Sequence, residues 1–271
     1  MFDEVDWLRP WLAPFVRLAR ACGTTRDWPV HMSAMARRQS MVNHAGRAIT
    51  FVDQAQLPVG TAYESYISDT GCIPTRNNLH DFFNALVWLR YPAAKVQLNA
   101  TQANEITSRA AAAAGQGPRP GSTPRGAVRD RATIFDENAG ILLTCDTSIE
   151  AAVRTHRWQE ALLDCRDAFG KRCEVRLFGH ALLEKLVRPY KAITAHVWIL
   201  AVPPAYFDTD PSERSQVVDH LLSASLRQGL LNVPATPLPV LGVPGWHPHQ
   251  DAAFYADAAV FRPRRPSPAG G

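Results

Sequence analysis

Apolar residues recur at helical spacing in several parts of the chain. Trp7, Trp11, Phe15 and Leu18 lie three or four residues apart, which predicts helices up to about residue 43, interrupted at prolines. The most regular pattern predicts a helix over residues 79–91, with Asn78 as its N-cap and Pro92 as its end. Further helices are predicted over residues 101–114, 148–165, 178–188 and 210–230.

Shorter apolar runs predict strands. Residues 192–202 form a buried strand with Thr194, His196 and Trp198 on one face. Two apolar runs, 132–135 and 141–144, flank five turn-prone residues and predict a β-hairpin. Short strands are also expected over 48–52, 63–67 and 175–178, and loops over 69–78 and in the Pro/Gly-rich region from residue 236. These elements predict an α+β fold with helices packed around a small mixed or antiparallel sheet.

The chain is expected to form a single domain over residues 1–271. Residues 115–126 are rich in Gly, Pro, Ser, Thr and Arg without apolar periodicity, which indicates a flexible internal linker. Residues 264–271 are predicted to be a disordered tail.

Composition and charge narrow the classes of protein. The net charge of +4 comes from arginines scattered among acids, which does not indicate a specific nucleic-acid surface. The apolar runs fall well short of the roughly 20 residues that span a bilayer, and the acidic start is unlike a signal peptide. The five cysteines do not form C-x-x-C pairs. A cytoplasmic, soluble protein with reduced thiols is therefore expected, and the sequence does not indicate an oligomeric state.

The helix over 79–91 carries its polar residues in one stripe. His80, Asp81, Asn84 and Trp88 fall within one quadrant of an otherwise apolar helix. One interpretation is a solvated stripe on a buried helix. The other is the wall of a polar cleft, in which His80 acts as a base or ligand and Asp81 or Asn84 orients a partner.

A second helix, over 178–188, carries His180 and Glu184 one turn apart on one face. A histidine and a carboxylate at this spacing can hold a divalent metal or form an acid–base pair. The alternative is a hydrogen-bonded pair on a surface face.

Other candidates would hold a small-molecule ligand. Arg76 precedes the first helix, where it could hold an anion near the helix N-terminus. Lys191 lies at the start of a strand and His196 within it, and each also fits a structural role. Trp246 lies in a rigid aromatic loop with His247 and His249, whose imidazoles offer a further metal hypothesis.

Several common motifs are missing from the sequence. It contains no G-x-S-x-G, P-loop, G-x-G-x-x-G after a strand, or H-E-x-x-H pattern. The common NTPases, dinucleotide-dependent dehydrogenases and α/β-hydrolases are thereby disfavoured.

The same segments carry a family likeness. Residues 78–89, 135–138, 178–185, 189–196 and 238–246 resemble the signature blocks of a bacterial family, domain of unknown function 3025. The resemblance runs from about residue 28 to residue 263, with a longer stretch than usual around residues 115–124. It implies a bacterial cytosolic protein of this architecture, and it supplies no catalytic residue.

The leading hypothesis is an enzyme that acts on a small polar or anionic substrate, by acid–base chemistry or with a metal. His80 and Asp81 would face His180 and Glu184, and Arg76 or Lys191 would hold the substrate. The alternative is a non-catalytic binding or scaffold protein in which the two polar stripes satisfy one another.

Overall fold

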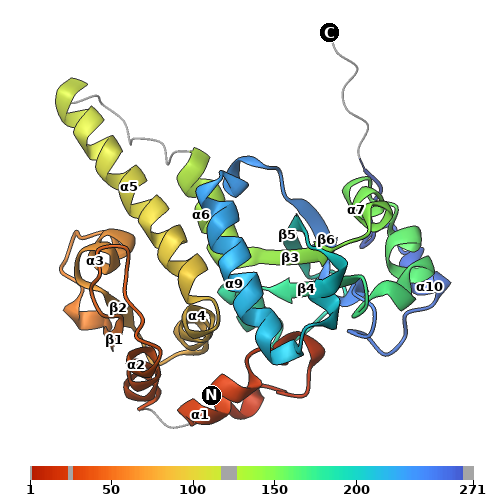
Figure 1. The fold of residues 1–271 in the computed structure, drawn as a ribbon, viewed down its shortest axis with the longest axis horizontal. Helices are drawn as coiled ribbons and strands as arrows, with labels where there is room; N and C mark the ends of the chain where they lie inside the picture. The colour runs from red at the N-terminus through yellow and green to blue at the C-terminus, as the bar shows by residue number, and fades with distance from the viewer. Residues whose placement is uncertain (1, 24–26, 117–126, 265–271) are drawn as a thin grey trace.

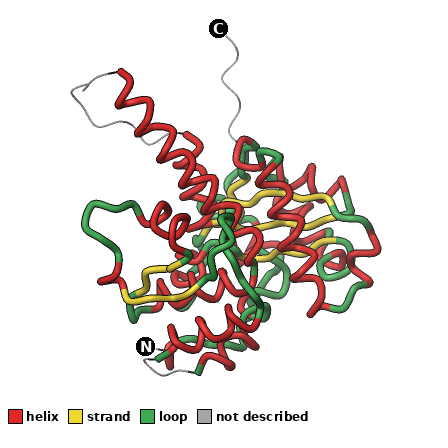
Figure 2. The backbone as a smooth tube through the Cα atoms, turned by 60° about the vertical axis from the view of Figure 1, so that its left-hand side comes forward, coloured by secondary structure: helices red, strands yellow, loops and turns green. Residues whose placement is uncertain are grey.

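The computed structural model describes residues 2–23, 27–116 and 127–264, and these form an α+β fold with two small sheets (Figure 1). In the smaller sheet, β1 (Thr50–Asp53) pairs in parallel with β2 (Cys72–Thr75). The other sheet has the order β4–β3–β5–β6. Figure 2 shows the two sheets apart from one another, with helices between them.

The four-stranded sheet is mixed, as the sequence predicts. Its buried strand β3 (Ala139–Thr144) pairs in parallel with β5 (Thr194–Ala201) and antiparallel with β4 (Cys173–Leu177). β6 (Thr236–Pro239) forms the other edge, antiparallel to β5, within a region predicted to be a loop. The expected α+β fold is therefore confirmed.

Helices make up most of the described chain. They are α1 (Val16–Cys22), α2 (Trp28–Arg38), α3 (Tyr63–Thr70), α4 (Leu79–Arg90), α5 (Pro92–Gln116), α6 (Ala127–Asn138), α7 (Thr147–Arg154), α8 (His180–Lys185), α9 (Pro211–Arg227) and α10 (Ala252–Tyr255). α4 is almost entirely buried and packs against α2, α5 and α8. None of the described helices is long and apolar enough to cross a membrane.

The predicted boundaries of α4 are confirmed. The Asn78 side chain accepts a hydrogen bond from the Asp81 amide at 2.7 Å, and the helix ends just before Pro92. Pro92 then begins α5, because proline is tolerated at the first position of a helix. The Asp219 carboxylate of α9 accepts hydrogen bonds from the amides of Ala93 and Ala94, so α5 starts nine residues earlier than residue 101.

The predicted hairpin over 132–144 is wrong, because its first arm is the end of α6. Ala132 and Phe135, three residues apart, are fully buried, while Ile134 between them is 39% exposed, which is a helical rather than an alternating pattern. The turn-prone residues 136–138 complete the last turn of this helix, and β3 follows directly.

Two further elements differ from prediction. Residues 63–67 belong to helix α3, which ends at Gly71 in the left-handed conformation (φ 77°), and the expected loop after it contains β2. The helix expected over 148–165 is interrupted near His156 (φ 57°), which separates α7 from a short π-helix over Gln159–Asp164.

The expected linker and tail lie largely outside the described residues. Of 115–126, the structure describes residues 115 and 116, which end α5. Of 264–271, it describes Arg264.

Candidate functional site

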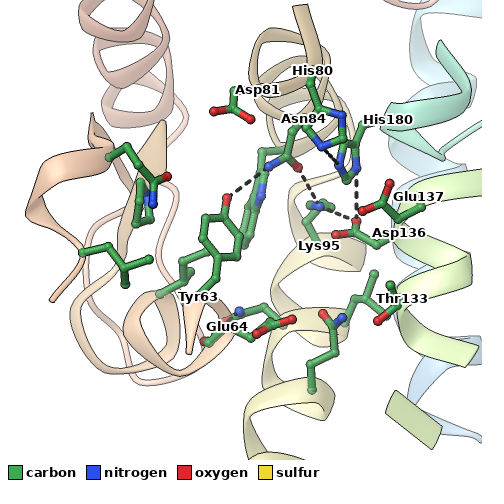
Figure 3. A pocket seen from close by; sticks show the side chains of 18 of the residues that line it. Tyr63, Glu64, His80, Asp81, Asn84, Lys95, Thr133, Asp136, Glu137 and His180 are labelled. Carbon is green, nitrogen blue, oxygen red and sulfur yellow. Dashed lines mark hydrogen bonds and ion pairs between the residues drawn. The ribbon is translucent and has the colours of Figure 1, made fainter. Parts of the chain in front are cut away.

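A cavity of about 280 Å³ lies among α3, α4, α5, α6 and α8 (Figure 3). Most of the side chains that line it are polar or charged. They include Tyr63, Glu64, Arg76, His80, Asp81, Asn84, Lys95, Asn99, Gln102, Thr133, Asp136, Glu137 and His180.

α4 presents one polar stripe to this cavity. His80, Asp81, Asn84 and Trp88 of α4 all line it, as their helical spacing predicts. Asp81 anchors the start of the helix, because its carboxylate accepts hydrogen bonds from the Arg76 amide at 2.6 Å and from the Arg76 guanidinium at 3.0 and 3.1 Å. Asp81 therefore holds the loop before α4 in place and forms an ion pair with Arg76.

α8 brings His180 beside His80 through a close backbone contact (Figure 3). The Gly179 amide donates to the Ala139 carbonyl oxygen at 2.9 Å. A Cβ at Gly179 would lie 2.5 Å from the backbone nitrogens of both Asn138 and Ala139. Glycine therefore permits α8 to start against the junction of α6 and β3, which places His180 beside the end of α6.

The two histidines meet at the centre of the site. His80 Nε2 lies 3.1 Å from His180 Nε2, with the rings nearly perpendicular at 75°. His80 Nδ1 lies 2.9 Å from Glu184 Oε2. The carboxylate fixes a hydrogen on Nδ1 of His80, which leaves the lone pair on Nε2.

The imidazole of His180 is more deeply buried than that of His80. It is 4% exposed, and burial lowers its pKa to about 4 although Asp136 lies nearby. Its Nδ1 has no hydrogen-bond partner among the described residues and lies 3.8 Å from Asp136 Oδ1. The ring is therefore neutral at pH 7, and the carboxylate favours the hydrogen on Nδ1. With the hydrogen of His180 on Nε2, that nitrogen donates to His80 Nε2 at 3.1 Å; with the hydrogen on Nδ1, the two Nε2 lone pairs face each other and a cation can lie between them.

Glu137 completes a group that could hold a metal ion. Ligand atoms of His80, His180 and Glu137 all lie within 4.8 Å of one another. Burial raises the pKa of the Glu137 carboxyl group, so leaving it charged without a cation nearby is costly. Two histidines and one glutamate are a ligand set of catalytic zinc sites, which leave a position open.

A buried polar network forms the floor of the cavity. The Lys95 ammonium, 3% exposed, donates to Asp136 Oδ1 and to Asn84 Oδ1, and the Asn84 amide donates to the Tyr63 hydroxyl at 3.1 Å. Burial disfavours the charged form of Asp136, but Lys95 and the histidines outweigh it and hold the pKa of this carboxyl group below its usual range.

Of the predicted site residues, six converge here. His80 contacts both His180 and Glu184, and Arg76, Asp81 and Asn84 line the cavity. The predicted metal pair of His180 and Glu184 is not what the structure brings together. Glu184 binds His80, and the carboxylate grouped with His180 is that of Glu137.

The other three predicted residues lie elsewhere. Lys191 pairs with Asp257 at 2.7 Å and stacks on the Phe254 ring. His196 of β5 accepts at Nδ1 a hydrogen bond from the side chain of Asn138, the last residue of α6, at 2.8 Å, which is a structural role. Trp246 packs against Trp11 in a separate cleft.

Sequence reasoning missed Lys95, Asp136, Glu137 and Tyr63. Asp136 and Glu137 fall in the predicted hairpin turn, Lys95 falls between two predicted helices, and Tyr63 falls in a predicted strand. The available signal was the pair of adjacent carboxylates that directly follows Phe135. In a helix with Phe135 on its buried face, these two carboxylates lie in the last turn.

Comparison with known proteins gives a family and no activity. Residues 49–265 match the model of a family described as a protein of unknown function, DUF3025. No curated protein matches the chain. No solved structure matches it either.

Proposed function

The chain belongs to the DUF3025 family, and we propose that it is a metal-dependent enzyme acting on a small polar substrate. His80, His180 and Glu137 are the metal ligands in this proposal. The observation that carries it is the convergence of one ligand atom from each of these side chains, all within 4.8 Å of one another, with the two histidine Nε2 atoms 3.1 Å apart.

The geometry of this gap fits a divalent cation. Two imidazole nitrogens bound tetrahedrally to one zinc ion are about 3.3 Å apart, given bonds of about 2.0 Å. The 3.1 Å separation needs little change to reach that value. The Glu137 carboxylate adds a negative charge to the set, and its ligand atom lies within 4.8 Å of both histidine nitrogens.

The surrounding carboxylates have the roles expected around a metal site. Glu184 orients His80 through Nδ1, and Asp136 faces Nδ1 of His180. Such partners fix the histidine rings with Nε2 toward the ion. When bound, a divalent metal would polarise a carbonyl or phosphoryl oxygen and acidify a water molecule.

The lining favours a small polar substrate over a strongly anionic one. Glu64, Asp81, Asp136 and Glu137 outnumber the two cations, and both cations are paired with carboxylates. A cavity of about 280 Å³ is at the lower end of the range for small-molecule sites. The buried Trp88 indole N–H has no hydrogen-bond partner in the described part of the chain, and it would offer a donor to a substrate acceptor.

Hydrolysis is the reaction class that these groups support best. The water oxygen would bond to the electrophilic carbon or phosphorus as the bond to the leaving group breaks. The water proton would pass to a site carboxylate and then to the leaving group, so the reaction requires no oxidant or reductant. The bacterial cytosol is the proposed location, and the five free thiols support it.

Metal titration of the purified chain tests the proposal. After chelation and dialysis, calorimetric titration with Zn²⁺ and Co²⁺ should give one equivalent per chain, and the Co²⁺ form should absorb strongly in the visible range, as tetrahedral sites do. His80→Ala, His180→Ala and Glu137→Ala should each lose this equivalent. A double His247→Ala/His249→Ala variant is the matched control, since these exposed histidines should not contribute to this site.

Activity separates an enzyme from a binding protein. The metal-loaded chain should hydrolyse at least one member of a panel of small esters, amides and phosphate esters, and His180→Ala should lose that activity. One bound metal without turnover on the panel would favour the non-catalytic alternative, which the mutually satisfied Lys95–Asp136–Asn84–Tyr63 network supports.

A further inference from the structure

A second cleft, of about 750 Å³, lies between the N-terminal segment, the end of α4, β4 and the start of α9. Its polar lining consists mainly of four arginines and one glutamate, and we call it the arginine cleft. The charged residues are Arg17, Arg90, Arg176, Arg214 and Glu174. In Figure 1 the N-terminal segment passes close to the lower end of α9.

Glu174 neutralises part of this charge and is saturated. Its carboxylate accepts from Arg176 Nε at 2.8 Å, lies 3.4 Å from Arg214 Nη1, and also accepts from the Tyr206 hydroxyl. Glu174 therefore does not pair with the other two arginines, Arg90 and Arg17.

Arg90 is the uncompensated member of the cluster. It is the last residue of α4, it is half-buried, and its Nε has no hydrogen-bond partner among the described residues. Burial lowers the pKa of its guanidinium, and the charges of Arg176 and Arg17 act in the same direction. Neither Arg90 nor Arg17 forms an ion pair within the part of the chain that the structure describes. Burying a donor group without an acceptor costs free energy, unless a bound ligand accepts its hydrogen bond.

The other walls of the cleft are apolar and aromatic. Trp11 and Trp246 lie with ring centroids 5.8 Å apart, and Pro10, Pro14 and Leu18 extend the same surface. Guanidinium groups bind phosphate through paired hydrogen bonds, and a cleft of this volume accommodates an organic group as well.

We propose that the arginine cleft binds a small organic phosphate, with the phosphate on Arg90 and Arg17 and the organic part against Trp246. An excess of three positive charges among the lining side chains favours a dianionic phosphate over a carboxylate. Trp246 then has a ligand-binding role in this cleft and not in the His80–His180 cavity. The inference does not depend on the proposed metal chemistry.

Binding of phenyl phosphate to the full chain tests the proposal. Titration calorimetry and tryptophan fluorescence should show saturable binding that weakens with salt and is about tenfold tighter than binding of inorganic phosphate. Benzoate should bind more weakly than phenyl phosphate. The His180→Ala variant should bind phenyl phosphate as the parent chain does, which places the ligand away from the histidine cavity.

Variants locate the site. Arg90→Gln should weaken phenyl phosphate binding at least tenfold while its thermal midpoint stays equal or rises, because a half-buried unpaired charge is removed. The exposed Arg17→Gln should weaken binding without affecting folding, and Trp246→Ala should abolish the preference for phenyl phosphate over inorganic phosphate. Arg157→Gln, on the distant α7 side, is the control and should bind as the parent chain does.

Three results would overturn the proposal. They are no saturable binding at millimolar phenyl phosphate, unchanged affinity in both Arg90→Gln and Arg17→Gln, or benzoate binding as tightly as phenyl phosphate.

Discussion

At the scale of single residues, the site depends on which nitrogen of each histidine carries its hydrogen. Glu184 sets this for His80, and Asp136 faces the corresponding nitrogen of His180. Neither carboxylate belongs to the metal-ligand group. Glu184 binds His80 Nδ1 and so directs Nε2 inward, whereas Asp136 Oδ1 lies 3.8 Å from His180 Nδ1, beyond hydrogen-bond distance. The residues that tune the site are therefore distinct from those that would contact the ion.

Glu184→Ala should weaken Zn²⁺ binding by roughly 10- to 100-fold, because His80 loses the partner that orients it. Glu184→Gln should have a smaller effect, since its amide oxygen still accepts from Nδ1. Calorimetric titration of the chelator-treated chain measures both. Glu150→Gln on α7, which breaks an ordinary surface pair with Arg154, serves as control; equal affinities in all four proteins would remove Glu184 from the site.

Lys95→Met should destabilise the fold by about 3 kcal/mol, because Asp136 and Asn84 lose the only ammonium that faces them in the described structure. Urea unfolding of the metal-free chain measures the loss. The double variant Lys95→Met/Asp136→Asn should recover part of it, since no buried charge is left unpaired. A double variant as unstable as the sum of its single variants would contradict this coupling.

At the scale of elements, the site is assembled from helix ends. The start of α4 supplies His80, the end of α6 supplies Asp136 and Glu137, and the start of α8 supplies His180. Helix ends converge here because α8 approaches the α6–β3 junction as closely as a glycine allows.

Gly179→Ala should reduce Zn²⁺ affinity at least tenfold, because its Cβ would clash with the backbone at Asn138 and Ala139 and push His180 away. Gly170→Ala is a matched control, because its φ of 84° strains an added side chain that meets no neighbour. Titration of both variants should show the affinity loss in Gly179→Ala alone. An equal loss in both would point to general destabilisation.

The N-terminus of α5 has its own cap, contributed from α9. Asp219→Ala should lower the free energy of unfolding by about 2 kcal/mol, because the amides of Ala93 and Ala94 lose their acceptor. Asp219→Asn should lose less, since one acceptor remains and burial raises the pKa of the Asp219 carboxyl group. Urea unfolding checks this order, and the reverse order would exclude the capping role. Both variants should keep one metal equivalent.

The sequence predicts α4, β5 and α9 well and the region around residues 127–144 poorly. The pattern on α4 is unambiguous because its single polar stripe, the N-cap Asn78 and the terminating Pro92 all predict the same helix. The run Ala132–Phe135 has too few residues to separate a strand from a helix, and only packing against α5 and α8 decides it. That error concealed Asp136 and Glu137, whereas the His180–Glu184 and His80–Asn84 stripes were readable from spacing alone.

At the scale of the whole molecule, α4 connects the two clefts. His80 lies in its first turn and Arg90 is its last residue, a separation of about 15 Å along the axis. One cleft has excess carboxylates and the other excess guanidinium groups, so they attract ligands of opposite charge. A cation site and an anion site at opposite ends of one buried helix fit an enzyme with a second ligand.

The two clefts should bind their ligands independently in single variants. Arg90→Gln should keep one Zn²⁺ equivalent with unchanged affinity, and His180→Ala should keep phenyl phosphate binding within about twofold, because sites without shared contacts are nearly additive. Calorimetric titration of each variant with both ligands measures this. Loss of both ligands in either variant would indicate one shared site or a damaged fold.

The central claim is that His80, His180 and Glu137 hold one divalent metal ion. Its most direct test is metal analysis of the chelated, Zn²⁺-reconstituted and dialysed chain beside the His180→Ala and His247→Ala/His249→Ala variants. We predict one zinc per chain in the parent and in the loop variant and none in His180→Ala. No bound zinc in the parent, or equal zinc in all three proteins, would contradict the claim.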